Sequence, residues 1–359
     1  MRNLGKLAVL GITALGLALA GPQDNSLVIG ASQEPRVLAG DFLSVISNQA
    51  IKSEIEQYLF APFIGFNADS QNFPVLATEV PTLENGRLRV TDIGGGKKRL
   101  EMDITIRPDA KWSDGRPITT EDVAFYFEVG KAKGMPVLNP DFWERVNVRI
   151  KDARNFTLIF EPAYYYDTYG PINTYAPKHI MGPEWERVKA AARGLDPQKD
   201  AEKLNELYRN FFIKFSTPQA LNRGAMVYSG PFMLRRWVPG NSIEMVRNPN
   251  FPIKPEGGES KYVQKVVYRF IQNTNSLLVA VIGGSIDATS SVSLTFDQGR
   301  SPQLVRRAPG RFDIWFVPGA IWEHIDINKF ENCQVVKDLG LNDKRTRQAI
   351  LHALNREGL

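Results

Sequence analysis

The chain has little of what most catalytic and metal-binding sites require, because its 359 residues include one cysteine and three histidines. The single cysteine, Cys333, excludes an intrachain disulfide. The histidines, His179, His324 and His352, lie far apart and show none of the spacings typical of metal ligands. We therefore expect no metal and no cofactor.

Catalytic motifs are missing as well. The sequence contains neither a Gly-x-Ser-x-Gly nor a His-Glu-x-x-His pattern. Residues 94–97, three glycines and a lysine, look superficially like a phosphate-binding loop. However, Lys98 stands where serine or threonine is needed, and the run joins two predicted strands instead of opening a helix. We expect a protein that is not an enzyme, with a secreted hydrolase as the remote alternative.

Charge of one sign is not concentrated in any long run. The 44 basic and 39 acidic residues are interspersed, so that the net charge of +5 is spread along the chain. We therefore expect no nucleic acid partner. A hydrophobic fraction of 43% with 23% charged residues is typical of a folded globular protein, and the length exceeds that of one ordinary domain.

The N-terminus resembles a signal peptide. Arg2 and Lys6 precede an apolar run over residues 7–17, which is too short for a permanent membrane span. Residues 18–20, Ala-Leu-Ala, form a small-x-small cleavage site. We predict that residues 1–20 are a signal peptide and that the mature protein is periplasmic or secreted. Because no cysteine follows the cleavage site, we expect no lipid anchor.

The most specific local pattern is a strand followed by a turn and a helix. Apolar and polar residues alternate over residues 100–107, which predicts a half-buried strand. Residues 113–115, Ser-Asp-Gly, have turn chemistry. Thr119 is placed to cap a helix, and Asp122 lies three residues further on, over the positive end of that helix.

This run closely resembles the signature of the family 5 extracellular solute-binding proteins, the peptide- and nickel-binding receptors of ABC importers. The family pattern reads roughly Lys-Trp-Ser-Asp-Gly-x-Pro-hydrophobic-Thr-x-Glu-Asp-Val-x-Phe. The matching residues are Lys111, Trp112, Ser113, Asp114, Gly115, Pro117, Thr119, Glu121, Asp122, Val123 and Phe125. Further similarities at residues 229–232, 247–251 and 343–357 extend the resemblance over nearly everything after the signal peptide.

The resemblance implies an α/β fold of the periplasmic-binding-protein type II-like class, with a two-lobe architecture that closes around a ligand. We assign residues 21–311 to the first lobe, which comprises a scaffold and an inserted subdomain at residues 50–160. Residues 312–359 are expected to begin the second ligand-binding lobe. That lobe is expected to be largely missing, because the family's sequence continues well beyond this point.

The resemblance also implies capture of a peptide ligand without catalysis, for delivery to the membrane ABC permease subunits. Peptide is favoured because the best-matched family members bind di- or oligopeptides, while oligosaccharides and nickel complexes remain open as ligands. When complete, such a receptor is expected to be a monomer. The alternative is that the chain is an inactive, truncated fragment of such a receptor.

The ligand contacts are predicted from three segments. One is the Glu-Pro turn after the strand predicted at residues 26–30, which in the family lies at the mouth of the cleft. The second precedes the Gly-Pro-Phe hairpin, and the third lies in an aromatic segment similar to a family strand. The candidate residues are Ser32, Gln33, Glu34, Tyr228, Ser229, Trp322, Glu323 and His324.

The C-terminal region is predicted to contain further regular elements. Residues 312–316 alternate in the manner of a strand, residues 321–328 resemble a strand of the family, and a helix opens at Asp343. Their apolar faces, including Ile350 and Leu354 on the helix, are expected to lack the elements that would cover them.

Overall fold

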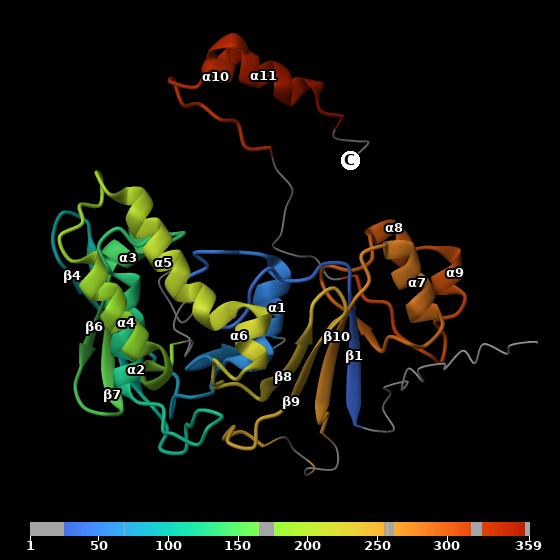
Figure 1. The fold of residues 1–359 in the computed structure, drawn as a ribbon, viewed down its shortest axis with the longest axis horizontal. Helices are drawn as coiled ribbons and strands as arrows, with labels where there is room; N and C mark the ends of the chain where they lie inside the picture. Colours follow the sequence, from blue (N-terminus) through green and yellow to red (C-terminus); the bar gives the residue numbers. More distant parts are fainter. Residues whose placement is uncertain are drawn as a thin grey trace, which may run out of the picture. The chain divides into compact units, whose positions relative to one another are not determined.

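The computed structural model describes residues 25–67, 69–164, 176–254, 257, 262–316 and 325–355. The chain divides into two compact units, Met1–Arg307 and Ala308–Leu359, which we call unit 1 and unit 2 (Figure 1). The boundary lies close to residue 312, where the second lobe is predicted to begin. The assignment of the two units to lobes stays a prediction.

Unit 1 contains a five-stranded mixed sheet in the order β11-β1-β10-β9-β8. Its strands are β1 (Ser26–Ala31), β8 (Phe232–Val238), β9 (Ser242–Arg247), β10 (Lys265–Phe270) and β11 (Ala288–Thr289). β1 is parallel to both of its neighbours, β10 and β11, whereas β9 is antiparallel to β10 and β8. The carboxyl ends of β1, β10 and β11 therefore lie at the same edge of the sheet.

A second sheet of unit 1 is antiparallel throughout, in the order β4-β5-β7-β6. Its strands are β4 (Leu88–Asp92), β5 (Lys98–Thr105), β6 (Val146–Ile150) and β7 (Asn155–Ala163). The predicted alternation is confirmed in β5, where Leu100, Met102 and Ile104 are buried and the residues between them are half-buried. The glycine-rich run at residues 94–97 lies in the loop that joins β4 to β5, as predicted.

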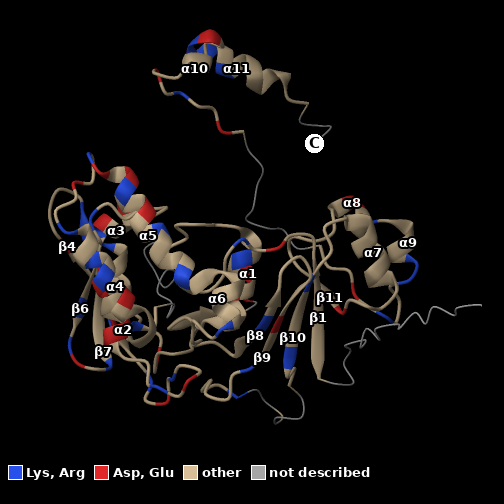
Figure 2. Cartoon of the chain, in the orientation of Figure 1, with Lys and Arg blue, Asp and Glu red and all other residues tan. Residues whose placement is uncertain are grey.

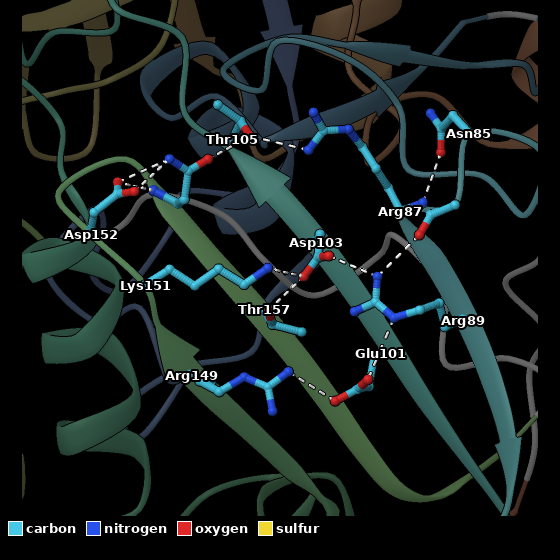
Figure 3. A network of polar contacts seen from close by, with 12 residues as sticks. Asn85, Arg87, Arg89, Glu101, Asp103, Thr105, Arg149, Lys151, Asp152 and Thr157 are labelled. Atoms are coloured by element: carbon cyan, nitrogen blue, oxygen red, sulfur yellow. Dashed lines mark hydrogen bonds and ion pairs between the residues drawn. The ribbon is translucent and has the colours of Figure 1, made fainter.

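The outward face of this second sheet carries a network of charged side chains (Figure 3). Asp103 lies at its centre and accepts hydrogen bonds from Arg89 (2.7 Å), Lys151 (2.8 Å) and Thr157 (2.5 Å). Burial alone would raise the pKa of Asp103, but these three hydrogen bonds outweigh it and hold the pKa well below its usual range. Both signs of charge are interspersed over the ribbon (Figure 2), so we assign this face to stability and not to an anionic or cationic partner.

The predicted helix after the Trp-Ser-Asp-Gly turn is confirmed as α2 (Thr120–Gly130), which begins with a capping box. The Asp122 carboxylate accepts from the N–H of Thr119 at 3.1 Å and from the indole of Trp112 at 3.2 Å. It also accepts from the N–H of Lys178 at 2.9 Å, at the start of α4 (Lys178–Ala192). Asp122 therefore joins the turn, α2 and α4, and burial raises its pKa.

The remaining elements of unit 1 pack around the two sheets. They are the hairpin β2 (Ile64–Phe66) and β3 (Asn72–Pro74) and the helices α1 (Ala50–Leu59), α3 (Pro140–Arg145), α5 (Ala201–Ser216), α6 (Pro218–Asn222), α7 (Thr274–Ile282), α8 (Phe296–Gly299) and α9 (Pro302–Val305). One large aromatic-rich core includes side chains from both sheets. A smaller cluster of Val28, Leu277 and Ile286 packs α7 against β1. Gly30 permits this close approach, since a Cβ there would lie 2.6 Å from a methyl of Leu277.

Unit 2 contains two helices, α10 (Gln334–Asp338) and α11 (Lys344–Ala353). The predicted strand at residues 312–316 is wrong, and residues 325–328 are not a strand either. A strand needs a neighbour to take its backbone hydrogen bonds, and every strand in the described chain lies in unit 1. The helix predicted to open at Asp343 is confirmed as α11, which Asp343 caps. None of its described residues is buried.

Over the described ranges, no helix has both the length and the apolar character that a membrane crossing requires.

Candidate functional site

The edge at the carboxyl ends of β1, β10 and β11 is the candidate ligand site. In open α/β sheets, ligands bind in the crevice outside the carboxyl ends of the strands. Three of the predicted contact residues, Ser32, Gln33 and Glu34, follow β1 directly and thus lie at this edge.

Ser32 fixes the start of the turn after β1. Its N–H and its hydroxyl both donate to the carbonyl of Val292, at 2.9 and 2.8 Å. The N–H of Ser290 donates to the carbonyl of Gly30 at 2.8 Å. The chain around the end of β1 and the chain around the end of β11 therefore each donate hydrogen bonds to the other. The Ser32 side chain is therefore already engaged within the protein.

Glu34 connects the same turn to the hairpin of β8 and β9 through two hydrogen bonds. One carboxylate oxygen accepts from the indole N–H of Trp237 at 2.7 Å, and the other accepts from the N–H of Gly240 at 2.8 Å. Gly240 has a φ of 72°, a left-handed conformation that favours glycine. A ligand contact by Glu34 stays a prediction, and it would have to compete with these two donors.

Gln33 lies between these two anchored residues. Its side chain is exposed. No residue in the described part of the chain hydrogen-bonds to that side chain. Of the three predicted residues in the turn, Gln33 is thus the one with its polar side chain available to a ligand.

Tyr228 and Ser229 do not present their side chains to solvent, and a ligand contact by either residue stays a prediction. Both are buried. The hydroxyl of Ser229 accepts from the N–H of Ala61 at 3.1 Å, and the Tyr228 ring packs 5.8 Å from that of Phe60. The backbone of Tyr228 exchanges hydrogen bonds with Ser113 of the signature turn, at 2.8 and 3.0 Å. Their structural role is to join that turn to the scaffold, and burial raises the pKa of the Tyr228 hydroxyl.

The other three predicted residues, Trp322, Glu323 and His324, lie outside the residues that the structure describes. Their role as ligand contacts stays a prediction.

Sequence reasoning missed Glu54, a half-buried residue of α1 close to the candidate site. Its carboxylate accepts from the hydroxyls of Tyr268, Ser290 and Ser291, at 2.8, 2.9 and 2.6 Å. These partners follow Glu54 by more than 200 positions. A glutamate on a helix that also carries other charged residues gives no sequence signal of such contacts.

A buried group of charges shapes the segment after the turn. The ammonium of Lys52 donates to the carbonyl of Asp41 at 2.9 Å and to the carboxylate of Glu56 at 3.2 Å. Glu56 also accepts from the N–H of Ala39 at 2.9 Å, and the Asp41 carboxylate accepts from the N–H groups of residues 45–47. Burial raises the pKa of Glu56 to about 7, against the opposing effect of Lys52, and it also raises the pKa of Asp41.

A cavity of about 600 Å³ lies elsewhere in unit 1, among residues of α2, α4 and α5. Its lining includes the buried side chains of Trp185, Leu204 and Tyr208. The carboxylate of Glu128 on its rim already accepts from the indole of Trp185 at 3.1 Å and from Lys189 at 2.6 Å. None of the five predicted contact residues that the structure describes lines this cavity, and we assign it no ligand.

The described residues give no support to a hydrolase. His179 pairs with Asp114 at 2.9 Å, and no serine, threonine or cysteine hydroxyl or thiol of the described chain is hydrogen-bonded to that histidine. Nucleophilic catalysis needs such a contact between nucleophile and base. Within the same ranges, no group of three histidine, cysteine, aspartate or glutamate side chains is placed to hold a metal ion.

Structural neighbours place this α/β fold among the periplasmic binding proteins. The model of the family described as "Bacterial extracellular solute-binding proteins, family 5 Middle" matches residues 97–359. The chain therefore belongs to family 5 of the bacterial extracellular solute-binding proteins.

Two solved or curated relatives cover most of this chain. The crystal structure of the oligopeptide-binding protein from Thermus thermophilus, complexed with a pentapeptide, is 98% identical with a TM-score of 0.92. The match covers 94% of this chain and 56% of that chain. The oligopeptide-binding protein AppA of Bacillus subtilis (strain 168) is 22% identical, over 94% of this chain and 51% of its own length.

A third relative, which matches a shorter part of the chain, is named for a different ligand. The peptidoglycan-binding protein YepA of Agrobacterium fabrum (strain C58) is 29% identical, over 53% of this chain and 26% of its own length. The chain thus spans about half the length of the first two relatives and a quarter of the third.

Proposed function

We propose that this chain is the peptide-capturing part of an extracytoplasmic receptor that delivers peptides to an ABC importer. The observation that carries the proposal is its 98% identity with an oligopeptide-binding protein whose structure was solved with a pentapeptide. The B. subtilis relative, also named for oligopeptide binding, supports the same ligand class.

The geometry of the candidate edge is suited to non-covalent capture. Ser32 and Glu34 hold the turn in place through hydrogen bonds to the exit of β11 and to the β8–β9 hairpin. A turn that is already ordered loses little conformational entropy when a ligand binds. The exposed amide of Gln33 both donates and accepts hydrogen bonds, which matches the alternating donors and acceptors of a peptide backbone.

Tight binding requires that a peptide be enclosed. Ligand sites bury most of the surface of their ligand, and a two-lobe receptor does so by closing one lobe on the other. Unit 1 would supply one wall of such a cleft.

Peptide binding can be tested by thermal shift and calorimetry with mixed pentapeptides, with oligosaccharides and a nickel–histidine complex in parallel. A ligand that binds only the native state at a hundredfold excess over Kd stabilises the protein by about 2.7 kcal/mol. We expect that stabilisation with peptides alone. A rise in melting temperature with sugars and none with peptides would indicate an oligosaccharide receptor. Hydrolysis of the peptides would support the alternative of a secreted hydrolase.

The place of binding can be tested with Gln33→Ala. Loss of one hydrogen bond should weaken pentapeptide binding by about threefold to tenfold, with no change in melting temperature of the free protein. Gln198→Ala is the matched control, because Gln198 is also exposed but lies far from β1 in the sequence, before α5. Equal affinities for Gln33→Ala and the control would remove Gln33 from the site.

A further inference from the structure

The carboxylate of Glu54 collects hydrogen bonds from two strands of the sheet that carries the candidate site. One oxygen accepts from the hydroxyl of Tyr268 in β10 at 2.8 Å. The other accepts from the hydroxyl of Ser290 and from both the N–H and the hydroxyl of Ser291, at 2.9, 3.1 and 2.6 Å. Ser290 and Ser291 come immediately after β11. Glu54 thus joins α1 to β10 and to the exit of β11.

These donors, and not a cation, satisfy the charge of Glu54. Within the described chain, no lysine or arginine forms an ion pair with it. Hydrogen bonds to a carboxylate are roughly twice as strong as those between neutral groups. Three of the four donors converge on a single oxygen, where the neutral oxygen of an amide would be a weaker acceptor than the carboxylate. The identity of this residue as glutamate is therefore matched to residues 290–291.

The contacts continue from Glu54 to the predicted ligand turn. The hydroxyl of Ser290 accepts from the N–H of Val292 at 3.2 Å, and the hydroxyl of Ser293 donates back to the carbonyl of Ser290 at 2.5 Å. This closes residues 290–293 into a compact turn. The carbonyl of Val292 then accepts both hydrogen bonds from Ser32. The orientation of that carbonyl follows from the placement of Ser290.

We infer that Glu54 is a positioning residue of the ligand site: it holds residues 290–293 so that the Val292 carbonyl fixes Ser32 and the exposed Gln33 beside it. Glu54 acts through residues 290–293 and Ser32, and it does not contact the ligand itself. The effect on peptide affinity rests on the proposed function, whereas the effect on Ser32 does not.

The two oxygens of the Glu54 carboxylate have different partners, so the two sets of contacts can be removed separately and their effects compared. Tyr268→Phe removes the donor on the β10 side and leaves the contacts to Ser290 and Ser291 in place. Glu54→Gln keeps the size of the side chain but removes its charge, which weakens the hydrogen bonds from Ser290 and Ser291. If Glu54 only stabilised α1, both variants should raise hydrogen exchange at Ser32 to the same extent. If Glu54 acts through residues 290–293, Glu54→Gln should raise that exchange and Tyr268→Phe should not.

The experiment measures amide hydrogen exchange at Ser32 in the full chain without ligand, followed by pentapeptide affinity. Glu54→Gln should speed exchange at Ser32 by about tenfold or more and weaken the peptide by about tenfold, the loss expected for one strong hydrogen bond. Tyr268→Phe should leave both within about twofold of the unmodified chain.

The outcomes separate the two proposals. If Ser32 exchange rises in Glu54→Gln and the unmodified chain binds no peptide, the positioning role stands and the proposed function fails. Unchanged exchange in a folded Glu54→Gln, or equal increases in both variants, would overturn the positioning role. Should Glu54→Gln fail to fold, the double variant Ser290→Ala/Ser291→Ala must show the same rise at Ser32, and its absence there would overturn the role as well.

Discussion

The two compact units differ in how far their apolar side chains are covered. In unit 1 the indoles of Trp112 and Trp237 are at most 2% exposed, whereas in unit 2 Trp315 is 80% exposed and Phe330 is 75% exposed. Helix caps predicted from the sequence are present in both units, since α2 is capped by Thr119 and α11 by Asp343. A capped helix is thus not enough to make a core, because most helical stability comes from the packing of its apolar face.

The largest expected contrast between the units comes from tryptophan truncation. Trp112→Ala should lower the free energy of unfolding by about 3–5 kcal/mol, since it removes a fully buried aromatic ring. Trp315→Ala, in unit 2, should change it by less than about 0.5 kcal/mol. Urea denaturation followed by circular dichroism measures both. Similar losses for the two variants would mean that the units do not differ in packing.

Buried charge should give the next contrast. Lys52→Met removes the cation beside Glu56 and Asp41 and should cost about 3 kcal/mol, because two carboxylates are then buried without a compensating charge. The control is Lys337→Met, on the surface of α10, for which we expect no measurable loss of stability. A stable Lys52→Met protein would show that the carboxylates are satisfied by backbone groups alone.

The pH dependence of stability should also be specific to unit 1. The pKa of Glu56 in the folded protein, about 7, exceeds its ordinary value of 4.5, so the folded state binds the proton more tightly. The stabilisation is fully present below about pH 4.5 and is lost as the pH rises through about 7. Glu56→Gln should flatten the stability profile between these values, and Glu331→Gln in unit 2 should not. Parallel profiles for Glu56→Gln and the unmodified chain would contradict the assignment.

The smallest expected effect concerns the charged face of the second sheet. Asp103→Asn should cost about 1–2 kcal/mol, because Asp103 accepts three hydrogen bonds, two of them from cations. The cost should shrink as salt is added, since partly exposed pairs are screened. Asp313→Asn in unit 2 is the control, because Asp313 is exposed and forms no ion pair within the described chain, and it should show no salt-dependent loss. If the loss of stability did not depend on salt, the charge of Asp103 would not be the source of its contribution to stability.

Sequence patterns predicted the elements whose stability is decided locally. The alternation of β5 and the capping box of α2 depend on residues close in the sequence, and both are present in the structure. The family assignment also followed from such a run, at residues 111–125.

The contacts that build the candidate site could not be predicted in the same way. The carboxylate of Glu34 meets the indole of Trp237 across 203 positions, and no periodicity marks either residue for the other. Tyr228 and Ser229 precede the Gly-Pro-Phe hairpin, and no local pattern indicates that their hydrogen bonds lie inside the scaffold. The strand predicted at residues 312–316 failed for a related reason, since alternation specifies a face but cannot supply a neighbouring strand.

The position of β1 has a consequence for the order in which the protein folds. This first strand is paired on one side by β10 and on the other by β11, and the N–H of Val28 bonds to Asp287, 259 positions later. Closing so long a loop is entropically costly, and contacts of this kind form slowly. The strands β4 to β7 pair with partners that are closer in the sequence than those of β1. We therefore expect β1 to pair with its neighbours later than the hairpins of the second sheet form.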